Sequence, residues 1–122
     1  MTAEAGRARR RLAQGAKADA LQSSLTAVDP RLAGWADEFI FGDVWEDEDL
    51  DHEAKMLVAI TALAATGKVG QLRNYLHGAL QSGVPEPRLR AALRMLVVYV
   101  GFPTAIAAMD ELRQVADREE YR

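Results

Sequence analysis

The chain of 122 residues contains no cysteine. This absence excludes disulfide bonds, thiol peroxidase chemistry, and zinc or iron–sulfur sites with cysteine ligands. No apolar run is long enough to span a bilayer. The first 22 residues are rich in Ala and Arg but lack the apolar core of a secretory signal. We therefore expect a cytoplasmic protein that has no membrane partner.

Net charge is also small, at -3. A chain with so little excess charge is a poor electrostatic match for nucleic acid or an anionic membrane. The basic run Arg7 to Arg11 is a local exception. It can be read as a nucleic-acid arm or as a solvated, frayed N-terminal segment, and we favour the second. No nucleic-acid partner is expected.

Helical periodicity is the dominant pattern, and no strong alternation typical of strands accompanies it. The length suits a single core, and no internal repeat is present. We predict an all-α fold, a compact helical bundle, with a polar helical arm at residues 1–28 and the main domain at residues 29–122. The expected helices cover about 7–24, 30–41, 52–66, 69–82, 87–100 and 103–116.

Apolar stripes along these helices predict the core. They comprise Leu32, Trp35, Ala36, Phe39 and Ile40; Met56, Leu57, Ile60, Leu63 and Ala64; Leu72, Tyr75, Leu76, Ala79 and Leu80; and Ala105, Ile106, Met109 and Leu112. Between Leu93 and Val100 only Arg94 is charged. That helix is expected to be buried on most sides, within the chain or in an oligomer.

The stretch from Asp43 to Asp51 is acidic. Its carboxylates at residues 46–49 suggest a metal site, but the alternating ligands and the turn glycine of a calcium loop are missing. We therefore expect a solvated connection with Trp45 folded back onto the core, and no metal site.

Four segments carry a resemblance to a known family. They are Phe39-Ile-Phe-Gly-Asp-Val-Trp45, Leu50-Asp-His-Glu-Ala-Lys-Met-Leu57, Gln71-Leu-Arg-Asn-Tyr-Leu-His-Gly-Ala-Leu80 and Tyr99-Val-Gly-Phe-Pro-Thr-Ala105. In this order and spacing the chain resembles the carboxymuconolactone decarboxylase family from about Leu32 to Leu112. The resemblance implies an all-helical ring, a homo-oligomer such as a trimer or hexamer, with sites near subunit contacts. It also implies loss of carbon dioxide from a lactone without metal or organic cofactor, so no cofactor is expected.

The site residues depart from both main branches of that family. Where peroxidase-like members carry Cys-x-x-Cys-x-x-His, this chain has Val69, Leu72 and Tyr75. Decarboxylase members have a His at the position of Tyr75 and an Arg at that of Lys55. Lys55 offers a point charge instead of a bidentate fork. Met56 stands where peroxidase-like members place an acid.

Decarboxylation leaves an electron pair that a conjugated carbonyl of the substrate can accept. The protein then supplies a hydrogen-bond donor and an acid. The candidate catalytic residues are Tyr75, His77 and His52. Tyr75 is either a pocket donor or a core residue bonded to a carbonyl. His77 lies about 200° further round the helix and is a surface residue of a lone chain unless a neighbour meets that face. His52 is either a substrate ligand or an ordinary first-turn residue.

The candidate substrate-binding residues are Phe41, Trp45, Lys55, Met56, Tyr99 and Phe102. We hypothesise a pocket that is drier and less cationic than that of the type enzyme, for a larger and more apolar ring system. The leading interpretation is a cofactor-independent enzyme acting on a small cyclic substrate. It is either a decarboxylase or a repurposed lyase, cyclase or isomerase of secondary metabolism. The alternative is a non-catalytic oligomeric domain that binds a ligand or a protein.

Overall fold

The computed structural model describes residues 3–118, and every regular element among them is helical. The elements in chain order are α1 (Ala3–Gln14), η1 (Gly15–Lys17), α2 (Ala18–Val28), α3 (Pro30–Trp35), the π-helix η2 (Ala36–Ile40), η3 (Val44–Glu46), α4 (His52–Ala65), α5 (Val69–Gln81), α6 (Glu86–Tyr99) and α7 (Phe102–Ala116). The predicted all-α class and helical bundle are confirmed. No helix within this range is long and apolar enough to cross a membrane.

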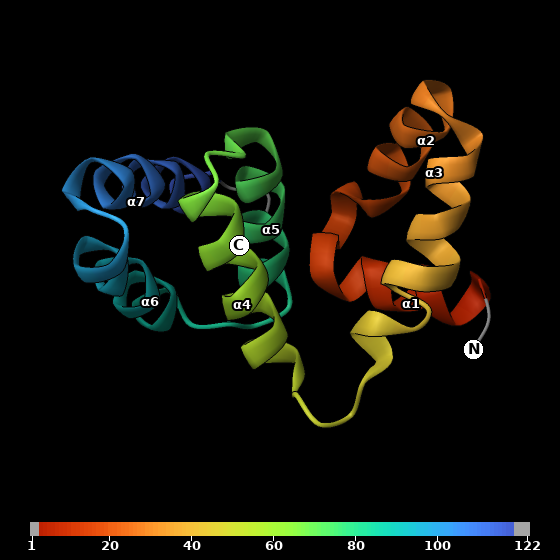
Figure 1. Cartoon of the computed structure of the whole chain (residues 1–122), viewed down its shortest axis with the longest axis horizontal. Helices are drawn as coiled ribbons and strands as arrows, with labels where there is room; N and C mark the ends of the chain where they lie inside the picture. Colours follow the sequence, from red (N-terminus) through yellow and green to blue (C-terminus); the bar gives the residue numbers. More distant parts are fainter. Residues whose placement is uncertain (1–2, 119–122) are drawn as a thin grey trace.

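Helices α4 to α7 form the main bundle (Figure 1). Its largest fully buried apolar side chains are Met56, Ile60, Leu72, Leu76, Leu89, Leu93, Leu112 and Val115. The stripes predicted for α4 and α5 therefore face the core, as expected from their helical spacing. The predicted ends of these helices are also confirmed. Asp51 Oδ1 accepts a hydrogen bond from Ala54 N at 2.8 Å, and Gly67 and Gly83 have positive φ angles.

Helix α1 lies against α5 on one side and against the π-helix η2 on another, and a glycine permits each close approach. A methyl group on Gly78 would overlap the carbonyl oxygen of Ala13, and one on Gly6 would overlap that of Asp37. The expectation of a solvated, frayed segment is therefore wrong for Arg10, which is only 3% exposed. Because α1 is fixed on both faces, Arg10 is held inside the molecule.

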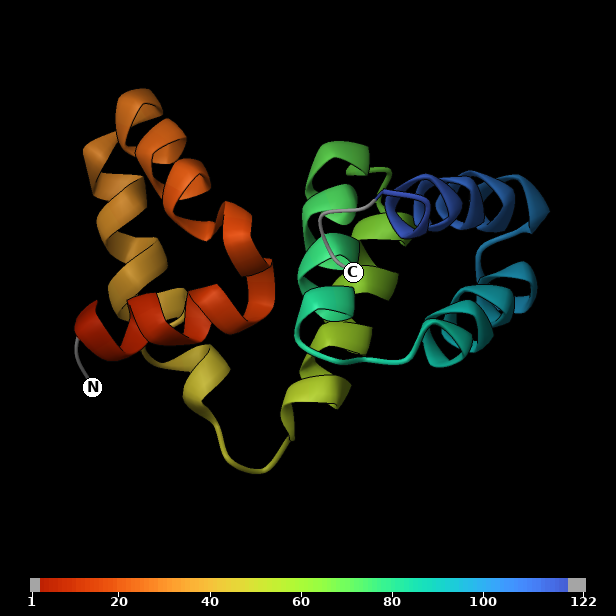
Figure 2. The same ribbon diagram turned by 180° about the vertical axis from the view of Figure 1, so that it is seen from behind.

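The hairpin of α2 and α3 projects beside the main bundle instead of covering it (Figures 1 and 2). The stripe predicted for α3 is therefore wrong in its orientation. Four of its large side chains are 41–58% exposed: Leu32, Trp35, Phe39 and Ile40. Ala36, the remaining residue of the predicted stripe, is buried as expected and shares the inward face with Ala33 and Asp37. Here Phe41 N bonds to Ala36 O at 2.9 Å across a π turn, whose extra residue breaks the ordinary helical register.

Helix α6 buries one face only. Leu93 and Leu96 are buried, whereas Val98 and Tyr99 are each 78% exposed. The prediction that this helix is buried on most sides is thus wrong for the single chain, because α6 packs mainly against α7 and α4. Ile106, expected to face inward, is exposed as well. We call the resulting patch the α6–α7 apolar surface, made of Met95, Val98, Tyr99, Phe102 and Ile106.

Candidate functional site

A cavity of about 350 Å³ lies between α1, α2, the π-helix and α5. Its walls combine apolar side chains with a few polar ones. The lining residues are Arg10, Gln14, Leu21, Gln22, Ser24, Leu25, Val28, Ala36, Ile40, Phe41, Gln71 and Tyr75. We call it the Tyr75 cavity. Such a concave, mostly apolar space with a few convergent polar groups is the usual form of a small-molecule site.

Arg10 supplies the charge in this cavity. Its Nη2 lies 2.7 Å from Asp37 Oδ1, and its guanidinium stands over the ring of Phe41 with 5.1 Å between the central carbon and the ring centroid. Burial lowers the pKa of Arg10, and the neighbouring Asp37 carboxylate opposes that shift. An arginine stays protonated under these conditions, so the cavity contains a buried cation.

Several polar atoms around Arg10 are buried without a hydrogen-bond partner. Among the described residues they include Arg10 Nη2, Asp37 Oδ1, Gln14 Oε1 and Gln22 Oε1. Arg10 Nη2 and Asp37 Oδ1 nevertheless form a buried ion pair with each other. The other carboxylate oxygen of Asp37, Oδ2, accepts a hydrogen bond from Gln22 Nε2 at 3.0 Å. Buried polar groups are normally bonded, so this cluster has spare hydrogen-bonding capacity.

Tyr75 joins the same cavity from α5. Its ring is the end of an aromatic row, with centroids 5.5 Å apart for Phe41 and Trp45 and 6.0 Å apart for Trp45 and Tyr75. Burial raises the pKa of Tyr75, while a hydrogen bond with Gln14 and the charge of Arg10 act in the opposite direction. The phenol is therefore neutral near pH 7 and available as a hydrogen-bond donor.

The two histidines lie outside this cavity. His52 is in the first turn of α4, with Nε2 2.9 Å from Ser82 Oγ. Its pKa is lowered by burial and then by the positive charges of Arg9 and Lys55, against a smaller opposing effect of Asp51. His77 is only 1% exposed, so the expectation of a surface residue in a lone chain is wrong. Helix α1 packs onto the neighbouring Gly78, a contact that the periodicity of α5 alone does not reveal.

The predicted substrate-binding residues are divided among different places. Phe41 lines the Tyr75 cavity, and Met56 is fully buried in the core. Lys55 Nζ donates to the carbonyl oxygen of Trp45 at 2.6 Å, and these two residues line a second hollow of about 390 Å³ beside α4. Tyr99 and Phe102 lie on the α6–α7 apolar surface, and neither lines either space.

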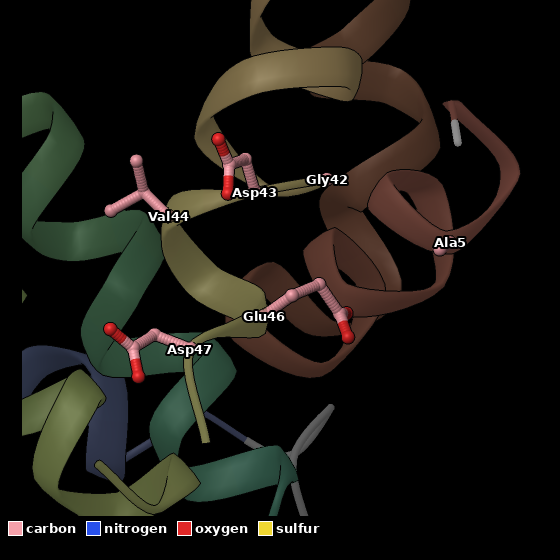
Figure 3. A pocket seen from close by; sticks show the side chains of 6 residues that line it. All are labelled: Ala5, Gly42, Asp43, Val44, Glu46 and Asp47. Atoms are coloured by element: carbon pink, nitrogen blue, oxygen red, sulfur yellow. The ribbon is translucent and has the colours of Figure 1, made fainter. Parts of the chain in front are cut away.

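The acidic connection forms a shallow hollow of about 600 Å³ next to α1 (Figure 3). In it the carboxylates of Asp43, Glu46 and Asp47 point in different directions instead of converging. Glu46 accepts a hydrogen bond from Arg9 Nε at 3.0 Å, and this bond lowers the pKa of Glu46. Trp45 packs against the core from this connection, as predicted.

The sequence singled out Arg10 only as part of the basic run Arg7 to Arg11, and it did not single out Gln14. Both are buried, together with Gly6 and Ala13, on one face of α1. The signal was present in their helical spacing, because small residues at positions 6 and 13 permit close packing. The run of arginines concealed it, since Arg-rich termini are usually solvated.

Comparison with known proteins identifies the family to which the chain belongs. A sequence model of the carboxymuconolactone decarboxylase family matches residues 30–114, more than two thirds of the chain. The chain is 31% identical over 77 residues to 4-carboxymuconolactone decarboxylase of Acinetobacter baylyi, covering 63% of this chain and 58% of that protein. It is 28% identical over 89 residues to nitrosuccinic acid decarboxylase npaB of Metarhizium robertsii, covering 70% of this chain and 62% of that protein. Each match thus spans less than two thirds of the relative's length. With these matches and its helical bundle, the chain belongs to the carboxymuconolactone decarboxylase family.

Proposed function

We propose that this protein is a decarboxylase-type carbon–carbon lyase that works in the Tyr75 cavity without a metal or an organic cofactor. The observation that carries the proposal is the neutral phenol of Tyr75 beside Arg10 and Gln14 in a mostly apolar cavity. Two relatives of this chain are named as decarboxylases. The family resemblance also implies that Tyr75 takes the position of the histidine of decarboxylase members.

The reaction needs little from the protein beyond donors and exclusion of water. The bond between the carboxylate carbon and the substrate breaks, carbon dioxide leaves, and the electron pair moves into a group that can accept it: the conjugated carbonyl of a lactone, or the nitro group of nitrosuccinic acid. The Tyr75 hydroxyl then donates a hydrogen bond to the oxygen that gains charge, which is the main source of stabilisation in such steps. A proton delivered by the phenol completes the product, and solvent restores the phenol.

The repurposed reactions use the same donor differently. A cyclase or isomerase would polarise a carbonyl through Tyr75 but release no carbon dioxide. A binding domain would bind its ligand in the same cavity without converting it. Because the two named relatives are decarboxylases, we place decarboxylation first.

The test is release of carbon dioxide by the purified protein from two acids, 4-carboxymuconolactone and nitrosuccinic acid. We expect one of them to be turned over above the rate of heat-unfolded protein. Substrate conversion without carbon dioxide would instead support a repurposed lyase, cyclase or isomerase. Binding without any conversion would support the non-catalytic alternative.

We also propose that the chain self-associates through the α6–α7 apolar surface. Three large side chains there are 63–78% exposed: Val98, Tyr99 and Phe102. Exposed apolar patches on a protein surface usually mark a contact with another protein. A second copy of the chain is the occupant that the family resemblance implies, and a closed ring would cover the patch on every subunit.

A further inference from the structure

Gln14 is the last residue of α1, and its backbone is fixed against α5. A methyl group added to Gly78 would lie 2.8 Å from Gln14 Cα, so the two helices meet closely at this residue. Just beyond it, Gln81 Oε1 accepts a hydrogen bond from Ala16 N at 2.6 Å. Because Gly78 and Gln81 belong to the same helix as Tyr75, these contacts fix the backbone at Gln14 relative to the phenol.

The Gln14 side chain is bonded to the Tyr75 hydroxyl inside the Tyr75 cavity. Only 8% of Gln14 is exposed, and both residues line this space. Burial raises the pKa of Tyr75, and the hydrogen bond with Gln14 lowers it. A bond that lowers the pKa of a phenol stabilises the phenolate, which only accepts hydrogen bonds, so the amide nitrogen of Gln14 is the donor. The amide oxygen, Gln14 Oε1, is buried without a hydrogen-bond partner among the described residues, which agrees with this direction.

We propose that Gln14 is a positioning residue that leaves the Tyr75 hydroxyl proton free for the substrate, by donating its own amide hydrogen to the phenol oxygen. The inference rests on the proposed function, since that proton is then available to the substrate oxygen that gains charge. It assigns a role in the reaction to α1, which precedes the residues that match the family model.

The direction of this hydrogen bond decides what the phenol can do. A phenol has one proton to donate, and its oxygen accepts through lone pairs. If the amide oxygen of Gln14 accepted that proton, the substrate would have to compete for it. With the amide nitrogen on the phenol oxygen, the proton stays free, and the bond polarises the hydroxyl into a stronger donor. Gln14 therefore acts on the substrate through Tyr75.

The pKa of Tyr75 tests the direction of the bond without any substrate. The other tyrosines of the chain are Tyr99 and Tyr121, so changing both to Phe leaves Tyr75 as the only one. Its ionisation is followed by the ultraviolet absorbance of tyrosinate during a pH titration, with circular dichroism to confirm that the protein stays folded. In this background Gln14→Met, which keeps the length of the side chain but has no donor, should raise the pKa by roughly 0.5–1, the equivalent of one hydrogen bond.

The sign of the change separates positioning from packing. A substitution that only loosened α1 would admit water, and the weaker burial would lower the pKa of Tyr75 toward its ordinary value of about 10. Loss of an acceptor would lower the pKa as well, because the neutral phenol would lose its partner. Gln71→Met is the matched control and should leave the pKa unchanged. Gln71 lines the same cavity, whereas the pKa of Tyr75 responds to Gln14 and Arg10.

If Gln14→Met fails to fold, the side-chain amide of the unchanged Gln14 reports the bond directly. Tyr75→Phe removes the phenol oxygen, so the amide proton resonances of Gln14 should move upfield in proton–nitrogen NMR spectra. Those of Gln114, which donates to Asp110 within α7, should stay in place.

The kinetic consequence is a split between kcat and KM. On whichever acid the wild-type protein decarboxylates, Gln14→Met should lower kcat by about 10-fold with little change in KM, because the phenol remains but its orientation is lost. An unchanged or lowered pKa in folded Gln14→Met would overturn the inference, as would unmoved Gln14 amide protons in Tyr75→Phe. A raised pKa with full kcat would overturn the positioning role. Failure of the proposed function looks different, since the pKa of Tyr75 would still rise in Gln14→Met while the wild-type protein released no carbon dioxide from either acid.

Discussion

At the scale of single residues, the ion pair of Arg10 and Asp37 matters most for stability, because both charges are buried. Their side chains are 4% and 11% exposed. Removing one partner leaves the other charged and buried, which is strongly unfavourable, whereas an intact buried pair contributes little net stability. The pair therefore fixes how α1 is seated on the π-helix more than it stabilises the whole fold.

We predict that Asp37→Ala lowers the free energy of unfolding by about 3–5 kcal/mol. Asp19→Ala is the matched control, because its pair with Arg11 is exposed and should matter by less than about 1 kcal/mol. Urea denaturation followed by circular dichroism measures both. Equal effects of the two changes would show that the Arg10–Asp37 pair is solvated in solution.

The lowered pKa of His52 predicts that the free energy of unfolding depends on pH. Burial and two nearby cations hold its folded-state pKa below the usual value. Below about pH 6.5, the ordinary histidine pKa, the unfolded chain therefore binds more protons than the folded one. Stability due to this group is present above that pH and is lost on acidification. Urea denaturation at pH 5, 6 and 7 should give a steeper decline for wild type than for His52→Gln. Parallel declines would contradict the lowered pKa.

At the scale of elements, the contact between α1 and α5 creates the Tyr75 cavity. Gly78 sets the distance between α1 and α5, because any larger side chain at this position meets the backbone of Ala13. We predict that Gly78→Ala destabilises the protein by about 1–3 kcal/mol through overpacking. Gly70→Ala is the control on the same helix, since its added methyl group would meet open space. Thermal unfolding compares the two, and equal melting temperatures would show that α1 does not pack closely on α5.

The sequence predicted the helices that pack on one another along a clear stripe. For α4 and α5 the spacing of apolar residues, the cap at Asp51 and the glycine ends were enough. For α3 and α6 the same apolar spacing gave the wrong exposure, because periodicity shows that a face is apolar but not what covers it. The outward turn of Leu32 and Trp35 depends on where the hairpin lies.

The candidate site was predictable only in part, for a related reason. Tyr75 was singled out because its helix has an apolar face and because the family resemblance implies a site residue there, and the structure places it in the candidate cavity. Arg10 and Gln14 become recognisable only when α1 is docked onto α5, a contact between segments far apart in the sequence. The expected grouping of Tyr99 with Phe41 did not occur within one chain, because α6 lies on the far side of the bundle (Figure 1).

At the scale of the whole molecule, the α6–α7 apolar surface predicts an oligomer. Light scattering after size-exclusion chromatography should give a mass of several subunits for wild type. Val98→Glu places a charge on this surface and should shift the protein to monomer. Val69→Glu, an exposed valine outside the patch, should not. A wild-type monomer at high concentration would contradict the proposed contact.

The most direct test of the central claim is the turnover of Tyr75→Phe beside the wild-type protein, on whichever acid wild type decarboxylates. Loss of the phenol hydroxyl removes the proposed donor while leaving the ring and its packing against Trp45. We predict a fall in kcat of about 100-fold or more, the usual scale for such a donor. Thr66→Val, which removes a hydroxyl bonded within α4, should leave kcat unchanged. Full activity in a folded Tyr75→Phe protein would show that the reaction does not depend on this group and that the active site lies elsewhere.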